Sequence, residues 1–365
     1  MSPERQPSVV ITGAAGFVGS ALTVRLSRDY RVFGIDRRLP TAALIAAAPG
    51  VQWIEADISD RTRLMSALRG IRAEHGSVDF VLHYAAFYHF GLRWLSEYER
   101  TNVEGTRNVI DAAAANGVNR LIFASSLAAM KGQPPGILAS LDITLDPFTP
   151  YGKSKAMGEE MLGEARDRVQ GISLRMGGVF TDWAELPPLS SLVRLWAGRG
   201  FDRRLIPGSG LTCLPYIYRR ELTALVEACL RSHENLQPYE ILTGSGRGGV
   251  THNELFEAIA REIPGSMRPV HVSPGLARAG LTIQCLLGAI VRNPPFEQPW
   301  MLRHLDLSWA ADNTATEEKI DWKEDPSCSL LARVPAIVKN YRQHRKIWEN
   351  RNHLRNTLQY QWHED

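Results

Sequence analysis

Short runs of apolar, often β-branched residues alternate with helical patterns over the first half of the chain. The first run, 9–11, ends at a glycine turn, and an amphipathic stretch with Val18 and Leu22 among its apolar residues follows. This order of strand, turn and helix recurs to about residue 176 and predicts an α/β fold, a doubly wound parallel sheet (Rossmann). We expect strands at 9–11, 31–35, 51–55, 80–83, 121–124 and 172–175, and helices at about 61–73, at about 99–116 and from Tyr151.

Beyond about residue 176 this alternation ends, and proline and glycine pairs interrupt the chain. Residues 221–230 predict a helix that returns to the sheet domain. Another helix begins near Thr251, where Thr251 or Asn253 can act as the cap and Glu254 follows Thr251 by three residues. We expect a smaller, discontinuous C-terminal lobe that closes over the carboxyl ends of the strands. The predicted division is 1–180 for the Rossmann domain, rejoined by about 212–235, with 181–211 and 236–340 as the substrate lobe and 341–365 as a basic C-terminal arm.

Two stretches near the C-terminus differ from this pattern of strands and helices. Residues 279–291 form the longest apolar stretch, which is too short to span a bilayer. The weakly amphipathic stretch 276–291 fits core packing, a cover over the substrate pocket or contact with a membrane surface, and we predict core packing. Residues 339–365 are basic, with Trp348 and Trp362, and predict an exposed helix or arm that could contact a partner or a membrane surface.

The composition excludes several other classes of protein. Of the 365 residues 44% are hydrophobic and 22% are charged, and the net charge of +3 gives no support to nucleic-acid binding. The segment 1–8 is polar and contains no signal peptide, so we expect a cytoplasmic protein without a membrane span. The cysteines are too scattered for a zinc site or a disulfide framework, and this fits a reducing compartment: Cys213, Cys229, Cys285 and Cys328.

The glycine turn after the first strand indicates a dinucleotide-binding site. Gly13 allows a tight turn, Gly16 lets backbone approach a pyrophosphate, and Gly19 lets helix pack on strand. The N–H groups and dipole at the start of the following helix favour phosphate.

Charged residues beyond the second and third strands bear on which dinucleotide binds. Asp36 lies 17 residues after Gly19, where a carboxylate binds the ribose hydroxyls of NAD and repels a 2′-phosphate. Arg37 and Arg38 could instead attract that phosphate, so NADP stays possible, but NAD is our prediction. Asp57 is placed either to accept a hydrogen bond from adenine or to cap a helix.

A hydroxyl, a phenol and an amine form the candidate catalytic group. Tyr151 and Lys155 are four residues apart, so both project from one face of the predicted helix. A nearby ammonium favours the phenolate and lowers the tyrosine pKa, which lets the tyrosine exchange a proton with an alcohol or carbonyl oxygen. Ser126, at the end of the preceding strand, can hydrogen-bond the same oxygen. The three together suit hydride transfer.

These motifs resemble the extended short-chain dehydrogenase/reductase family, the group of NAD-dependent epimerases/dehydratases and 3β-hydroxysteroid dehydrogenase-like enzymes. The resemblance covers about 1–180 and continues more weakly to about 340. Its motifs occur in the family's order: Thr12-Gly13-Ala14-Ala15-Gly16-Phe17-Val18-Gly19, Asp36, Asp57, His83-Tyr84-Ala85-Ala86, Thr101-Asn102-Val103-Glu104-Gly105-Thr106, Ser125-Ser126, Tyr151-Gly152-Lys153-Ser154-Lys155 and Leu174-Arg175-Met176-Gly177-Gly178-Val179-Phe180.

The resemblance implies a role for each matching residue. Ser126, Tyr151 and Lys155 would be catalytic, Asn102 would support the helix geometry near Lys155, and a homodimer would be usual. No metal is expected. The expected cofactor-binding residues are Gly13, Ala15, Gly16, Phe17, Val18, Asp36, Arg37, Asp57, Ile58, Ala85, Ala86, Tyr151 and Lys155, and the expected substrate pocket contains Phe87, Tyr88, Ser126 and Gly178.

Three departures from the family pattern concern the substrate. Nucleotide-sugar enzymes usually carry an asparagine where Gly177 and Gly178 stand, and an arginine for the diphosphate where Leu214 stands. Loss of both anchors would remove several kcal/mol of charge-assisted hydrogen bonding. Leu127-Ala128 replaces the carboxylate pair of dehydratases. Arg219 and Arg220 keep a phosphorylated substrate possible, although a solvated surface pair is the favoured interpretation.

Aromatic residues in the loop after the fourth strand predict an apolar pocket, although a lid that packs on the second lobe explains them as well. They are Phe87, Tyr88, His89, Phe90 and Trp94. His83 and His89 have no clustered acidic partner and are interpreted as core and pocket residues rather than metal ligands.

Three functions are compatible with these residues. The main hypothesis is an NAD(P)-dependent oxidoreductase that interconverts a secondary alcohol and a ketone on an apolar small molecule such as a sterol, terpenoid or polyketide. The alternative is a nucleotide-sugar epimerase that uses the same residues with a transient oxidation. A non-catalytic dinucleotide sensor is the third, and the intact set of Ser126, Tyr151 and Lys155 argues against it.

Overall fold

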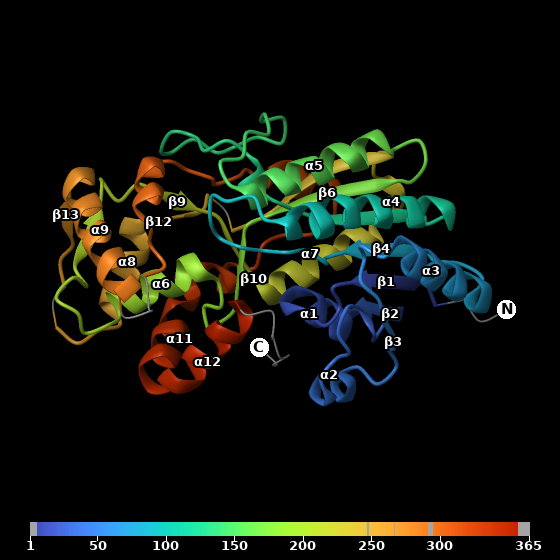
Figure 1. Cartoon of the computed structure of the whole chain (residues 1–365), viewed down its shortest axis with the longest axis horizontal. Coiled ribbons are helices and arrows are strands. Elements are labelled where there is room, and N and C mark those ends of the chain that lie inside the picture. Colours follow the sequence, from blue (N-terminus) through green and yellow to red (C-terminus); the bar gives the residue numbers. More distant parts are fainter. Residues whose placement is uncertain (1–5, 247, 266, 291–294, 357–365) are drawn as a thin grey trace.

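A parallel sheet at one end of the molecule and a mainly helical lobe at the other make up the fold (Figure 1). The computed structural model describes residues 6–246, 248–265, 267–290 and 295–356, with side chains to residue 353. The seven strands of the sheet lie in the order β11-β6-β5-β4-β1-β2-β3, and every neighbouring pair is parallel. Their bounds are β1 Ser8–Thr12, β2 Arg31–Asp36, β3 Gln52–Glu55, β4 Phe80–His83, β5 Arg120–Ser126, β6 Gly171–Met176 and β11 Tyr239–Gly244.

Helices cover both faces of this sheet, which confirms the predicted doubly wound fold (Figure 1). In β1, Val9 and Ile11 enter the core on the α1 and α7 side, whereas Val10 packs on the opposite face. Burial on both faces explains why the strands read as continuous apolar runs. The flanking elements are α1 Phe17–Leu26, α2 Ala42–Ala47, α3 Arg61–His75, the π-helical η1 Tyr98–Glu104, α4 Gly105–Ala115, η2 Leu127–Ala129, α5 Pro150–Glu164, α7 Arg219–Arg231 and η3 His233–Asn235.

The second lobe has its own core, built around Trp196 and Phe256. Its helix α8 begins as predicted, because Thr251 caps it and Glu254 completes a capping box. Its elements are β7 Gly178–Phe180, α6 Pro187–Trp196, β8 Leu205–Pro207, β9 Cys213–Leu214, β10 Tyr216–Tyr218, β12 Val250–Thr251, α8 His252–Arg261, β13 Val270–Val272, α9 Pro274–Ile290, η4 Pro299–His304, η5 Pro326–Cys328, α11 Leu330–Gln343 and α12 Arg345–Asn356, and α10 Thr314–Lys319 packs on β11 of the sheet.

The seventh strand of the sheet comes from the range 236–340 that we assign to the substrate lobe from the sequence. β11 pairs with β6 along its whole length, from Tyr239 opposite Gly171 to Gly244 opposite Met176. The boundary at about residue 235 is therefore displaced by one strand. The short apolar run 241–242 between glycines and polar residues gave too weak a strand signal to find β11.

The predicted core packing of 276–290 is wrong. Gly288 is the only buried residue of α9, and Leu276, Ile283, Leu286, Leu287 and Ile290 are all exposed. Among the other elements, the helix makes its most extensive contact with η4. Val291, the last residue of the predicted stretch, lies outside the described residues.

The exposed helix or arm predicted for 339–365 does form a helix, α12, but the prediction that it is exposed is wrong as far as residue 353. Trp348 has no exposed surface and packs edge-on against Tyr341, with their ring centroids 5.0 Å apart. Arg351 is buried and pairs with the buried Glu185 at 2.6 Å. These contacts make α12 part of the second lobe. Residues 357–365, with Trp362, lie outside the described residues.

No helix within the described ranges has the length and apolar character needed to cross a membrane.

The packing of Trp348 predicts a large effect of its removal. Trp348→Ala should lower the free energy of unfolding by about 3–5 kcal/mol, because it leaves a large cavity beside Tyr341. Urea denaturation measures this change. Ile347→Ala on the exposed side of the same helix is the control and should change stability by less than about 0.5 kcal/mol. Equal effects of the two substitutions would contradict the docking of α12.

Candidate cofactor and active site

One cleft of about 2020 Å³ runs along the carboxyl ends of the strands and continues into the second lobe. Open parallel sheets bind their ligands at this edge. Of the predicted site residues, only Ala15 and Asn102 are absent from its lining. Those that line it are Gly13, Gly16, Phe17, Val18, Asp36, Arg37, Asp57, Ile58, Ala85, Ala86, Phe87, Tyr88, Ser126, Tyr151, Lys155 and Gly178.

The turn between β1 and α1 leaves no room for side chains at its first and last glycines. Gly13 has a φ of +70°, and a Cβ there would lie 2.7 Å from the backbone nitrogen of Ala85. A Cβ on Gly19 would lie 2.0 Å from the carbonyl oxygen of Gly13. Gly16 is the N-cap of α1 and offers no side chain to its first turn. This bare helix start fits a dinucleotide pyrophosphate.

Asp36 lies at the end of β2 beside this turn. Its Oδ2 accepts a hydrogen bond from the backbone N–H of Ala15 at 3.0 Å, and its Oδ1 accepts one from Arg38 at 3.2 Å. Burial raises the pKa of Asp36, although these bonds oppose the shift. Ala15 therefore belongs to the site by holding Asp36, even though it does not line the cleft.

Asp57 follows β3 and lines the same end of the cleft. It pairs with Arg100 at 2.8 Å and accepts from the N–H of Ser59 at 2.9 Å. Partial burial raises the pKa of Asp57, the bonds to Arg100 and Ser59 lower it, and the net shift is downward. The cap of α3 is Asp60 rather than Asp57.

The candidate catalytic residues meet where α5 passes the end of β5. A Cβ on Gly152 would lie 2.1 Å from the carbonyl oxygen of Ala128, so glycine allows α5 to approach the segment after β5 this closely. Ser126 Oγ accepts from the N–H of Ala128 at 3.1 Å and faces the cleft together with Tyr151.

Lys155 lies on the same helix and is almost completely buried. Its ammonium lies 4.9 Å from the centroid of the Phe123 ring and 5.7 Å from that of Tyr151. Burial lowers the pKa of Lys155 to about 7. A polar ligand group beside this amine would offset the loss of solvation.

Asn102 lies in the π-helical turn η1, which packs against α5. Its Nδ2 donates to Ser154 Oγ at 2.8 Å and to the carbonyl oxygen of Phe87 at 2.9 Å, while the N–H of Phe87 donates to its Oδ1. Asn102 thus joins α5 to the loop after β4. The arrangement supports a positioning role for this residue.

An aromatic cluster forms the wall of the cleft on the lobe side. Phe148 lies between His304 and Trp309, with centroid distances of 4.0 and 5.5 Å, and Phe90 stacks near Phe296 and Trp300 at 5.1 and 5.7 Å. Of these residues we predict only Phe90 from the sequence. The others come from distant segments without a shared motif.

The loop after β4 adds an aromatic contact to the candidate catalytic group. The rings of Tyr88 and Tyr151 meet edge to face at 4.8 Å. His89 is exposed at the cleft, whereas His83 is buried between Thr12 and Thr106, with a pKa that burial lowers to about 3. His83 is therefore neutral at physiological pH.

The positions that depart from the nucleotide-sugar pattern are apolar in the structure as well. Gly178 leaves space that the side chain of Leu186 fills, since a Cβ there would lie 2.4 Å from Leu186 Cδ2. Leu214 lines the cleft. Arginines line its lobe end: Arg194, Arg199, Arg203, Arg342 and Arg345.

The interpretation of Arg219 and Arg220 as a solvated pair is wrong for Arg219. It is buried, donates to the carbonyl oxygen of Phe17 at 3.2 Å and stacks on the Phe17 ring. Arg220 is largely exposed and lies 3.7 Å from Asp325. Neither is among the described residues that line the cleft.

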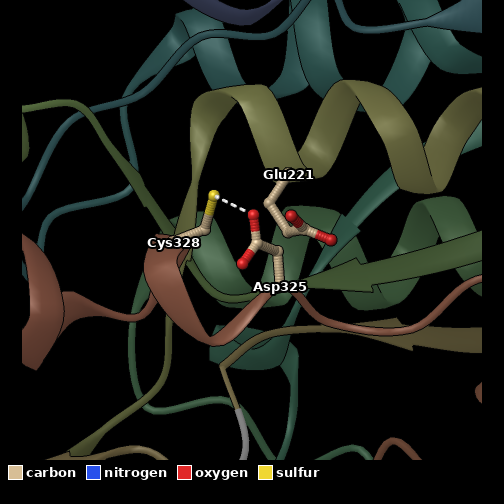
Figure 2. A group of neighbouring side chains, drawn as sticks. All are labelled: Glu221, Asp325 and Cys328. Atoms are coloured by element: carbon tan, nitrogen blue, oxygen red, sulfur yellow. Dashed lines mark hydrogen bonds between the residues drawn. The ribbon is translucent and has the colours of Figure 1, made fainter.

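Glu221, Asp325 and Cys328 form the one group of potential metal ligands found among the described residues (Figure 2). Trp322 Nε1 donates to Glu221 at 2.8 Å, and Arg220 Nη2 lies 3.2 Å from Cys328 Sγ. Burial raises the pKa of both Glu221 and Cys328, which favours their protonated forms. A guanidinium already neutralises this group, so we assign it no metal.

The fold and the cleft together define a dinucleotide-dependent enzyme of the Rossmann type. The model of the NAD dependent epimerase/dehydratase family matches residues 9–242, and the chain belongs to this family. The cofactor of the family is NAD, which the bare start of α1 and the carboxylate of Asp36 fit.

Curated relatives and a solved structure add detail. A putative UDP-arabinose 4-epimerase of Arabidopsis thaliana is 31% identical over 66% of this chain and 61% of its own length. An N-acetyl-α-D-glucosaminyl-diphospho-ditrans,octacis-undecaprenol 4-epimerase of Escherichia coli O157:H7 is 34% identical over 43% of each chain. The crystal structure of the Bordetella bronchiseptica enzyme WbmG in complex with NAD superposes with a TM-score of 0.69, at 23% identity, over 94% of this chain and 97% of the other.

The position of Asp36 predicts the preference between the two dinucleotides. Asp36→Ala should raise affinity for NADP relative to NAD by about tenfold or more, because it removes a charged acceptor and a repulsive charge. Calorimetric titration with each dinucleotide measures this ratio. Asp36→Asn removes the negative charge but keeps an oxygen that can accept the hydrogen bond from the N–H of Ala15. Asp57→Asn is the control. Preference of the wild type for NADP would contradict the prediction and give the decisive role to Arg37 and Arg38.

Burial of Lys155 predicts a pH-dependent stability. Its folded pKa of about 7 lies below the value of about 10.4 in an unfolded chain, so the unfolded state binds more protons between these values. Stability without cofactor should therefore rise with pH through this window.

The variant Lys155→Met isolates this effect. It should exceed the wild type in free energy of unfolding by a few kcal/mol at about pH 6, with the gap closing towards about pH 10. Urea denaturation at several pH values measures the gap. Lys153→Met, on the exposed side of α5, should show no such trend. If the difference in free energy of unfolding between Lys155→Met and the wild type stayed constant with pH, the pKa of Lys155 would not be lowered in the folded protein.

Proposed function

We propose that the protein is an NAD-dependent epimerase that inverts the C4 hydroxyl of a diphosphate-linked sugar. The observation that carries this proposal is the common cleft lined both by Ser126, Tyr151 and Lys155 and by the glycine turn between β1 and α1. The two relatives described above carry names of sugar 4-epimerases, which favours our alternative over the main hypothesis of a dehydrogenase for sterol-like molecules.

In the proposed reaction Tyr151 takes the proton of the C4 hydroxyl and the carbon becomes a ketone. NAD supplies the hydride acceptor and donor when it is bound. Ser126 hydrogen-bonds the reacting oxygen, and Lys155 stabilises the tyrosine phenolate. Inversion requires the ketone to present its opposite face before Tyr151 returns the proton, and the cleft of about 2020 Å³ has room for this rotation. Atoms and electrons balance without a co-substrate.

The lining of the cleft bears on the group that carries the sugar. Gly178, Leu186 and Leu214 leave the usual diphosphate positions without polar side chains, so the arginines at the lobe end of the cleft would have to bind the diphosphate of either carrier. The aromatic wall suits an apolar carrier, as in the substrate named for the Escherichia coli relative. We therefore propose a lipid-linked diphosphate sugar, with a nucleotide sugar as the second candidate.

The dehydrogenase stays a candidate because the same apolar wall suits a hydrophobic alcohol. The two reactions differ in net turnover: a dehydrogenase accumulates oxidised or reduced cofactor with its product, and an epimerase leaves the cofactor absorbance unchanged. A homodimer and a cytoplasmic location stay predictions.

The proposed role of Tyr151 is tested by Tyr151→Phe, which removes the exchangeable proton but keeps the ring. Turnover should fall by about 10²–10⁴-fold because general acid–base catalysis is lost, while NAD affinity should hardly change. NMR of the C4 configuration measures turnover, with polyprenyl-diphosphate and UDP sugars as substrates, and calorimetry measures NAD binding. Tyr30→Phe, outside the cleft, is the matched control. Full activity of Tyr151→Phe would exclude the mechanism.

A further inference from the structure

The helix α9 exposes an apolar surface at the end of the molecule opposite the sheet (Figure 1). At 100° per residue, its exposed large residues fall within one stripe about 100° wide. This stripe consists of Leu276, Ile283, Leu286, Leu287 and Ile290. Ile290 is 78% exposed, a value more typical of a charged side chain.

The opposite side of α9 is the side that packs. Gly288 is buried, Leu281 and Cys285 are partly buried, and all three lie on the far side of the helix from the exposed stripe. Cys285 Sγ lies 3.8 Å from the carbonyl oxygen of Glu297, beside η4. The stripe therefore lies on the side of α9 away from these contacts, and all five of its residues are exposed.

Neighbouring segments extend this surface. β13, which leads into α9, pairs with β8, and Arg204 Nε donates to the carbonyl oxygen of Arg268 at 2.9 Å. Beside β8, the ring of Phe201 is 96% exposed. We call the exposed stripe of α9 together with 199–205 and 267–272 the α9 surface.

Basic side chains dominate the charge of the α9 surface. The segments 199–205 and 267–272 contain a single acidic residue, Asp202, and four arginines. None of these arginines forms an ion pair with a described residue. They are Arg199, Arg203, Arg204 and Arg268.

We propose that the α9 surface docks on a lipid bilayer that contains anionic headgroups. An outward apolar stripe with flanking arginines is the pattern of a helix that lies in the membrane interface, where apolar side chains enter the acyl boundary and cations meet the headgroups. Charge complementarity decides between a bilayer and a second copy of the chain, because two copies joined through this surface would bring arginines together.

The cleft opens beside this surface. Leu276, Leu287 and Ile290 belong to the exposed stripe and also line the cleft, so the apolar lining continues onto the docking surface. A molecule anchored in the bilayer would reach the cleft without crossing water. The docking itself does not depend on the proposed reaction.

The test uses co-sedimentation of the full chain with vesicles of phosphatidylcholine alone and of phosphatidylcholine with phosphatidylglycerol. The wild type should bind the anionic vesicles, and salt should weaken the binding. Ile283→Glu/Leu286→Glu alters the stripe outside the cleft lining and should lower the partition coefficient by about tenfold or more. The matched control Ile45→Glu/Leu331→Glu changes exposed apolar residues elsewhere and should bind like the wild type.

A second pair of variants tests the charge. Arg204→Gln/Arg268→Gln should weaken binding to anionic vesicles, whereas Arg69→Gln/Arg72→Gln on α3 should not. NAD affinity and thermal unfolding of each variant establish that it is folded.

Three outcomes would overturn the proposal: no binding of the wild type to anionic vesicles, equal binding of Ile283→Glu/Leu286→Glu, or a stable dimer that this variant converts to a monomer without any vesicle binding by the wild type. The last outcome would assign the surface to a second copy. Turnover of a water-soluble sugar substrate by Ile283→Glu/Leu286→Glu reports on the proposed reaction separately.

Discussion

The contact between the backbones of Gly13 and Gly19 is the constraint on which the cofactor end of the molecule depends. The carbonyl of Gly13 lies where any larger residue at position 19 would place its Cβ, so strand and helix can approach this closely only without side chains. That approach sets α1 across the end of β1 with its uncapped N-terminus towards the cleft. The same turn holds Asp36 through the N–H of Ala15, so phosphate and ribose recognition share one local geometry.

A similar close approach organises the reacting end. Gly152 brings α5 against the carbonyl of Ala128, and a Cβ on Gly158 would lie 2.3 Å from the ring of Phe123. Because α5 lies so near the sheet, Lys155 is buried over the same ring, and its charge is sensitive to what occupies the cleft. Backbone contact thus positions Tyr151 and Lys155 on α5. The hydrogen bond from Asn102 to Ser154 holds this helix in place.

The Rossmann half could be predicted from sequence because its signals are local. The strand at 80–83 and the capping box at Thr251 arise from patterns within a few residues, and the structure contains both. The second lobe gave no such signal. Phe148 meets Trp300 and Trp309 across more than 150 residues of sequence, and the polar composition of α12 conceals a fully buried Trp348. The apolar pattern of α9 predicted burial because hydrophobicity alone does not distinguish a core from a surface that meets an apolar partner.

The late position of β11 in the chain has a consequence for synthesis of the protein. The buried guanidinium of Arg120, the first residue of β5, donates to the carbonyl oxygens of His233, Leu236 and Gln237, just before β11 begins. A nascent chain that ends short of these residues holds a buried arginine without its acceptors and a sheet with an open edge at β6. The Rossmann half therefore completes its sheet only after β11 has emerged, and with it the first part of the second lobe.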